Sequence, residues 1–148
     1  MVTRRYLLDT NILIAMFRGE YQIQERLVHE GFDRCVVSDV SLGELYTGAF
    51  ISGRPHEFRQ VEFVRNNFEI ISSSRSFVTF GRLRALLSEK GNKIDDLDVY
   101  IASSALDNNY ILVTNNVKHF SRIPNLEVRD WFEEHSRQIT AEKYLSFR

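Results

Sequence analysis

The chain has 148 residues, a length that favours a single domain with one hydrophobic core. Hydrophobic residues make up 43% and charged residues 26% of the sequence, a composition that excludes the disordered and fibrous classes of protein. The 19 lysines and arginines nearly balance the 20 aspartates and glutamates, so overall charge does not indicate a polyanionic partner.

The chain contains a single cysteine, Cys35, within the apolar run CVV. A single cysteine cannot form an internal disulfide, and it excludes a zinc site made of cysteines. The apolar surroundings indicate that Cys35 is a small buried hydrophobic residue of a protein in a reducing compartment. No apolar run approaches the roughly 18 residues that span a bilayer, and the first residues do not form a signal peptide. We therefore expect a cytoplasmic protein with no membrane association.

Strand and helix patterns alternate along the chain without a linker, a repeat or a low-complexity tract. The predicted strands lie in 5–8, 35–38, 68–72, 110–114 and at the start of 126–132. Helices are predicted from Asn11 to Gly19, over 22–30, 39–52, 55–66, 77–90 and 97–105, and after the last strand. This order predicts one α/β domain over residues 1–148, with a mainly parallel sheet of four or five buried strands covered by helices on both faces.

Polar side chains follow several of the predicted strands. Asp9 comes where the first strand ends, and Glu44 lies in the helix after the second strand. Asp98 begins the helix before the fourth strand, and Asn115 and Asn116 follow that strand. In open parallel sheets the functional site lies outside the carboxyl ends of the strands. We therefore expect these side chains to collect at one edge of the sheet.

Most of these residues also have a purely structural interpretation. Asp9, Thr10 or Asn11 could cap the first helix. Asp95 could cap the later helix, with Asp98 in its first turn stabilised by the helix dipole. Asn115 and Asn116 could form an ordinary turn. Glu44 is different, because it lies inside an apolar helix between Leu42 and Leu45, where no cap is needed. Taken singly, capping is the better interpretation of Asp9 and Asp98, whereas the three carboxylates together indicate a shared role.

Three carboxylates in one site require a cation. At about 4 Å and an effective dielectric constant near 20, each pair would repel by roughly 4 kcal/mol, so the groups would protonate or separate. Because the sequence has no cysteine cluster and no histidine pair at metal-binding spacing, oxygen ligands favour Mg²⁺ or Mn²⁺ over zinc. Such a cation suits phosphate chemistry, since it activates water and stabilises charge on phosphoryl oxygens.

Four segments carry a resemblance to a known family. In their order and spacing, LLDTNILI, VVSDVSLGELYTGA, IDDLDVYIASSAL and LVTNNVKHFSRIPNLEVRDW resemble the PIN-domain ribonucleases, specifically the VapC toxins of toxin–antitoxin pairs. The resemblance covers about residues 5–131 and leaves an extension at 132–148. It implies a PIN-like α/β fold, Mg²⁺ or Mn²⁺ as cofactor, endonucleolytic cleavage of RNA, inhibition by a cognate VapB-type antitoxin protein, and a homodimer.

The resemblance also assigns roles to individual residues. Asp9, Glu44 and Asp98 match the catalytic acidic residues that bind metal in the family. Asp95 and Asp96 are alternatives to Asp98, but the segment DVYIA aligns Asp98 best. The fourth acidic position is Asn116 here; its amide oxygen can ligate a metal or hold a water, but it lacks the charge that a second metal would need. The positions that orient the acidic residues or their waters are matched by Thr10, Asn11, Ser38 and Thr114.

With RNA as substrate, the resemblance implies hydrolysis by a metal-activated water, which leaves 5′-phosphate and 3′-hydroxyl ends and needs no histidine pair. The four histidines are scattered and fit surface or packing roles, with His119 notable for following the two asparagines. Basic side chains on two helices could contact phosphates, although solvated helix faces explain most of them better: Arg54, His56, Arg59 and Arg65, and Arg82, Arg84, Lys90 and Lys93. Three phenylalanines could stack on bases but fit core or partner contacts better: Phe50, Phe58 and Phe63.

Two other functions compete with this one. A phospho-receiver domain is also a small α/β protein that binds Mg²⁺ at strand ends, but it needs an adjacent acidic pair after the first strand, where this chain has Asp9 followed by Thr10 and Asn11. A catalytically weakened PIN-like module that binds RNA or protein would explain Asn116. The presence of the other three carboxylates favours an active enzyme.

Overall fold

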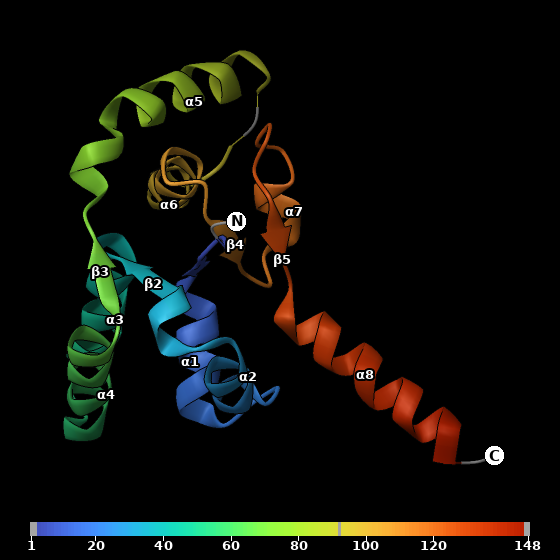
Figure 1. Cartoon of the computed structure of the whole chain (residues 1–148). Helices are drawn as coiled ribbons and strands as arrows, with labels where there is room; N and C mark the ends of the chain where they lie inside the picture. Colours follow the sequence, from blue (N-terminus) through green and yellow to red (C-terminus); the bar gives the residue numbers. More distant parts are fainter. Residues whose placement is uncertain (1–2, 92, 147–148) are drawn as a thin grey trace.

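The computed structural model describes residues 3–91 and 93–146, in which a parallel sheet lies between two sets of helices (Figure 1). The sheet has five strands in the order β3-β2-β1-β4-β5, and each pair of neighbours is parallel. Their bounds are β1 Tyr6–Leu8, β2 Cys35–Ser38, β3 Glu69–Ile71, β4 Ile111–Val113 and β5 Val128–Arg129. The predicted α/β class and parallel sheet are confirmed.

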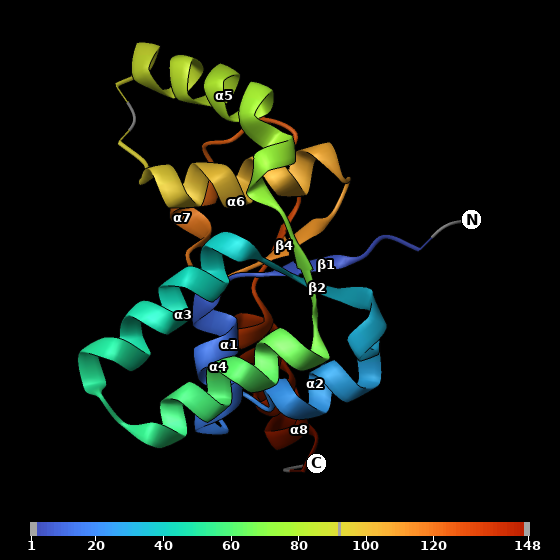
Figure 2. The same cartoon turned by 90° about the vertical axis from the view of Figure 1, so that its left-hand side faces the viewer.

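Helices connect the strands and cover both faces of the sheet. In both views, α5 and α6 lie on the opposite side of the sheet from α1 and α2 (Figures 1 and 2). The helices are α1 Thr10–Arg18, α2 Ile23–Glu30, α3 Asp39–Ser52, α4 Pro55–Asn67, α5 Phe77–Glu89, α6 Asp96–Asp107, α7 Val117–Phe120 and α8 Trp131–Ser146. Two short 3-10 helices, η1 Phe32–Arg34 and η2 Ser73–Ser76, precede β2 and α5.

Local chemistry explains where these helices begin and end. The Ser38 hydroxyl accepts a hydrogen bond from the Val40 amide at 3.2 Å and so caps α3. The Asp95 carboxylate caps α6 in the same way, through the Leu97 amide at 2.8 Å. Gly53 ends α3 with φ of 66°, a left-handed conformation that glycine adopts without steric cost. The helix α7 has no such signal in the sequence and was not predicted.

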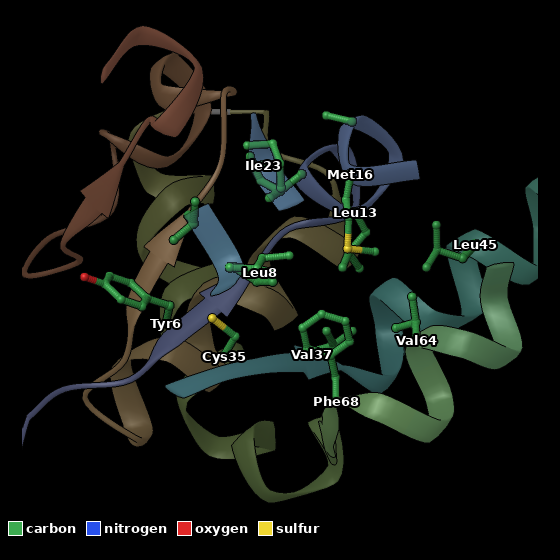
Figure 3. Close-up of a cluster of buried hydrophobic side chains, with 14 of the residues drawn as sticks. Tyr6, Leu8, Leu13, Met16, Ile23, Cys35, Val37, Leu45, Val64 and Phe68 are labelled. Atoms are coloured by element: carbon green, nitrogen blue, oxygen red, sulfur yellow. The ribbon is translucent and has the colours of Figure 1, made fainter. Parts of the chain in front are cut away.

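The core has two halves, one on each face of the sheet. Leu7 of β1 packs with the side chains of α5 and α6. Leu8 packs instead with those of α1 and α2 (Figure 3). Because the central strands are buried on both faces, their residues are apolar without alternation, as in other parallel sheets. The edge strands β3 and β5 are only partly buried, so the expectation of buried strands throughout is wrong at the edges, where one side of each strand has no neighbour.

The last helix, α8, lies mostly outside this core. Its first residue, Trp131, is 1% exposed, and its ring packs edge-on against Tyr6 with a centroid distance of 5.3 Å. Beyond its first turns, α8 projects away from the body of the molecule (Figure 1), and Tyr144 is 76% exposed. Within residues 3–91 and 93–146, no helix is long and apolar enough to cross a membrane.

Candidate active site

The register of the three central strands brings Asp9 to the middle of the carboxyl edge of the sheet. Leu8 pairs with Val37 of β2 and with Val113 of β4. The residues that follow these partners, Asp9, Ser38 and Thr114, therefore leave the sheet side by side. The Asp9 amide donates to the Val113 carbonyl at 2.9 Å, which extends the ladder by one residue and fixes the position of this carboxylate.

The Asp9 carboxylate is buried and accepts two hydrogen bonds. Its Oδ1 accepts from the Thr10 amide at 2.8 Å, and its Oδ2 accepts from the Thr114 hydroxyl at 2.8 Å. The first contact shows that the predicted capping role is real. The second joins Asp9 to the end of β4, which a cap does not require, so Asp9 serves both the start of α1 and the site.

Glu44 reaches the same site from α3. This helix packs against both α1 and α6, and the half-buried Glu44 accepts a hydrogen bond at Oε1 from the Thr10 hydroxyl at 2.9 Å. Thr10 thus holds Asp9 through its backbone and Glu44 through its side chain. The unusual position of a glutamate within an apolar helix is explained, because Glu44 faces the carboxyl edge of the sheet rather than the solvent.

Asp98 approaches from the opposite face of the sheet, in the first turn of α6. The positive end of the helix dipole stabilises a carboxylate there. Its Oδ2 lies 3.5 Å from Nδ1 of His119, and that nitrogen lies 3.0 Å from the amide nitrogen of Asn116. The Asn116 backbone in turn donates to the Thr114 hydroxyl at 3.0 Å. A continuous series of contacts therefore joins Glu44, Asp9 and Asp98.

The electrostatics of the three carboxylates show that they share one site. Burial raises the pKa of Asp9, and the negative charge of Asp98 adds to this increase against the hydrogen bonds from Thr114 and Thr10. Burial likewise raises the pKa of Glu44, with further increases from Asp9 and Asp98. The pKa of Asp98 is raised by burial and by Asp95, whereas His119 lowers it. Asp98 therefore makes ionisation of both Asp9 and Glu44 less favourable, and Asp9 does the same for Glu44.

The chemistry of this site fits a hard divalent cation. Its donors are carboxylate and amide oxygens, which Mg²⁺ and Mn²⁺ prefer. The amide oxygen of Asn11 is buried without a hydrogen-bond partner among the described residues, so one more oxygen is available. However, no three histidine, cysteine, aspartate or glutamate side chains within 3–91 and 93–146 already form a group that could hold an ion. The three carboxylates therefore lie around one edge of the sheet without forming a preformed metal cage.

The supporting residues fall into two groups: some contact Asp9 or its partner Thr114, and one lies at the start of α3. Thr10 and Thr114 contact Asp9 directly, and Asn11 donates its amide to Asn115 and to the Thr114 hydroxyl, the latter at 3.5 Å. Ser38 is buried, and its hydrogen bonds run to Val40 and Asp39 at the start of α3. It therefore acts on the helix that carries Glu44 rather than on a carboxylate of the site.

A groove opens beside Glu44. It has a volume of about 450 Å³ and runs between α1, α3 and α4, with Glu44 at its lining. Arg18, Arg54, His56 and Glu57 also line it, and Glu57 lies 3.7 Å from Arg54, so the groove combines one catalytic candidate with arginine charge that a neighbouring carboxylate partly offsets. A cavity of similar size, about 470 Å³, lies between α2 and α8 and includes none of the three carboxylates.

The other basic and aromatic candidates are dispersed. Arg65 lies 3.9 Å from Glu62, and Arg84 lies 3.1 Å from Asp96, so neighbouring carboxylates offset part of their charge. Phe50 is 73% exposed, and it meets Phe58 edge-on at the α3–α4 hairpin. Among the histidines, His119 is the one whose place beside Asp98 could not be assigned from the sequence. The only signal was its spacing of three residues from Asn116, the residue that precedes α7, which brings the two side chains to one side of this turn.

Comparison with known proteins identifies the family. The model of the PIN domain family matches residues 6–126. The chain belongs to the PIN domain family. It is 32% identical over 130 residues to Ribonuclease VapC1 of Haemophilus influenzae (strain R2866), covering 85% of this chain and 97% of that protein. The predicted membership of the VapC ribonucleases and the predicted class of enzyme are thereby confirmed.

Two further relatives extend this comparison of the PIN domain. The tRNA(fMet)-specific endonuclease VapC of Salmonella typhimurium is 31% identical over 130 residues, with 86% of this chain and 98% of that protein covered. The crystal structure of VapBC2 from Rickettsia felis bound to a DNA fragment from their promoter contains a chain that is 33% identical. It matches with a TM-score of 0.72 over 85% of this chain and 98% of that chain. The predicted PIN-like fold is confirmed.

The raised pKa values predict how stability depends on pH. Between the ordinary carboxyl pKa of about 4 and the raised values of Asp9, Glu44 and Asp98, the folded chain holds more protons than the unfolded chain. The free energy of unfolding therefore falls as pH rises through this window. We expect the melting temperature in EDTA to decrease from pH 5 to neutral pH, and Mg²⁺ to reduce the decrease.

Thermal unfolding in EDTA and in Mg²⁺ at matched ionic strength measures this effect. A cation at ten times its dissociation constant stabilises the folded chain by about 1.4 kcal/mol if it binds only that state. Identical pH profiles with and without Mg²⁺ would show that the carboxylates do not bind the cation.

Proposed function

We propose that this chain is a VapC-type endoribonuclease toxin that depends on Mg²⁺ or Mn²⁺ and is inhibited by a VapB-type antitoxin. The observation that supports it best is the convergence of Asp9, Glu44 and Asp98 at the carboxyl edge of a PIN-domain sheet, where burial and neighbouring negative charge raise their pKa values. We further propose a cytoplasmic homodimer, with each chain forming one domain over residues 1–148.

In this proposal the three carboxylates hold the cation, with Asn116 and Asn11 as neutral oxygen donors. When bound, the cation lowers the pKa of a water and stabilises charge on the phosphoryl oxygens. Thr10 and Thr114 fix both oxygens of Asp9 on a strand end that the ladder holds rigidly. Thr10 also fixes one oxygen of Glu44, so the protein sets the arrangement of both carboxylates before the substrate arrives.

The groove beside Glu44 offers a path for single-stranded RNA. Arg18, Arg54 and His56 line it and can contact the phosphates on one side of the cut, which would position the strand without reading its sequence. Because a relative is a tRNA(fMet)-specific endonuclease, initiator tRNA is the first substrate to test.

A cleavage assay with the purified, antitoxin-free chain tests the proposal. We expect Mg²⁺ or Mn²⁺ to support cleavage of tRNA into products with 5′-phosphate and 3′-hydroxyl ends, and EDTA to abolish it. Glu44→Gln preserves the side-chain length and the hydrogen bond from Thr10 but removes the charge, so we expect cleavage to slow by at least about 100-fold.

Glu25→Gln is the matched control for this assay. Glu25 is exposed in the first turn of α2, away from the three carboxylates, so its neutralisation should leave cleavage unchanged. Cleavage that persists in Glu44→Gln would indicate another site or a contaminating nuclease. Absence of cleavage of any RNA, with intact binding of RNA or antitoxin, would instead favour the weakened binding module that Asn116 suggests.

A further inference from the structure

One glycine of α3 lies in the groove beside Glu44. Gly48 is exposed, belongs to the interior of the helix, and lines the groove together with Glu44 and, on α1, Ile14 and Arg18. Residues four apart lie on the same face of a helix, about 6 Å from each other, so Gly48 stands one turn from Glu44. At this point the wall of the groove next to the carboxylate carries no side chain.

Neither the backbone conformation nor the packing of Gly48 requires a glycine. Its backbone is helical rather than left-handed. A Cβ atom at this position would meet none of the described residues within 4 Å beyond its own stretch of helix, so alanine would fit without a clash. Glycine is among the least favourable residues inside a helix, because it loses the most backbone entropy on folding. The fold alone would therefore favour alanine here.

The open space in front of Gly48 lies on the route between Glu44 and a basic side chain. Arg54 follows the end of α3, lines the same groove, and is 68% exposed. Its ion pair with Glu57, at 3.7 Å, is partly in solvent and contributes little, so a phosphate can compete for the guanidinium group. Along α3, Gly48 lies between Glu44 and Arg54. A strand that reaches both of these residues passes over the glycine.

We propose that Gly48 is a substrate-contact residue: it lets the sugar–phosphate backbone of a single RNA strand approach α3 closely, so that the phosphate to be cut reaches the cation proposed at Glu44. This inference rests on the proposed ribonuclease function. Glycine permits the close approach of a backbone to a ligand, and a methyl group at this point would move the strand outward. A displacement of about 1 Å at the reacting group can lower a rate by about 100-fold.

Gly48→Ala tests this inference because activity and stability should change in opposite directions. We expect the melting temperature to rise by about 2–4 °C and kcat/KM for initiator tRNA to fall by about tenfold or more. Gly48→Leu fills more of the groove and should lower kcat/KM further. Binding of labelled initiator tRNA in EDTA, where no cleavage is expected, should weaken in the same order, whereas a purely structural role would leave this binding unchanged.

Gly43→Ala is the matched control for these variants. Gly43 lies in the interior of the same helix and is exposed, and a Cβ atom there would likewise meet none of the described residues within 4 Å. It lies outside the groove lining. The same gain in melting temperature should therefore come with unchanged cleavage and unchanged binding of RNA.

The possible outcomes separate this inference from the proposed function. Wild-type cleavage and binding in both Gly48 variants would overturn the role of Gly48, assign the groove to a protein partner or to none, and leave the proposed function intact. Equal losses in Gly43→Ala and Gly48→Ala would also overturn it, because they would trace the loss to a stiffer helix. A wild-type chain that cleaves no RNA would overturn both proposals.

Discussion

Replacing Asp9 with Asn is expected to abolish RNA cleavage and, in the same protein, to increase stability when no metal is present. Burial raises the pKa of Asp9, so its ionised form at pH 7 costs free energy that the neutral amide does not. The amide oxygen still accepts from the Thr10 amide, so the start of α1 is preserved, while the amide nitrogen donates to the Thr114 hydroxyl that donates to Asp9 in the wild type. We expect the free energy of unfolding in EDTA to rise by about 1 kcal/mol, or roughly 2–4 °C in melting temperature.

The loss of activity has the same physical cause as the gain in stability. The carboxylate that destabilises the metal-free fold is also the proposed ligand of the cation. Without it, the transition state loses several kcal/mol of charge stabilisation, which lowers the rate of cleavage by about 10³-fold. Cleavage assays and thermal unfolding in EDTA and in Mg²⁺ measure the two effects. With Mg²⁺ the order of stability should reverse, because only the wild type binds the cation well.

Asp33→Asn provides the matched control for the Asp9 variant. Asp33 is exposed in η1, before β2 begins, and so lies at the opposite edge of the sheet from the site. The same change of charge there should alter neither cleavage nor the response to Mg²⁺. An Asp9→Asn protein that cleaves RNA at the wild-type rate, or that is less stable than the wild type in EDTA, would contradict the assignment of Asp9.

The fold could be predicted from sequence because its signals are local. The apolar run YLL is buried on both faces, as a central parallel strand must be, and Gly53 adopts a left-handed conformation where the predicted helix ends. Exposure could not be predicted in this way. Ile51 continues the apolar pattern of α3 but is 82% exposed, because the end of α3 extends past the elements that cover the rest of the helix.

The site was only partly predictable, because its residues meet through tertiary structure. Asp9, Glu44 and Asp98 could be named from their places after strands and within helices. The contact between Thr10 and Glu44 depends on how α1 packs on α3, which no local pattern encodes. His119 lies near Asp98 only because a four-residue helix turns its side chain toward α6, and a helix that short gives no periodicity to detect.

Trp131→Ala is expected to have the largest effect on stability among substitutions outside the site. The Trp131 ring is almost completely buried, meets Tyr6 edge-on, and lies 4.8 Å from the Arg26 guanidinium. Its removal leaves a large cavity between α8 and β1 and takes away both aromatic contacts. We expect the free energy of unfolding, measured by denaturant titration, to fall by about 3–5 kcal/mol.

Tyr144→Ala on the same helix is the matched control, because Tyr144 is largely exposed where α8 projects from the body. It should change stability by no more than about 0.5 kcal/mol. The contrast separates two parts of α8: a first turn that completes the core beside β1, and a projecting part that the fold does not need. Equal losses in the two variants would contradict this division and show that the whole helix packs against the protein in solution.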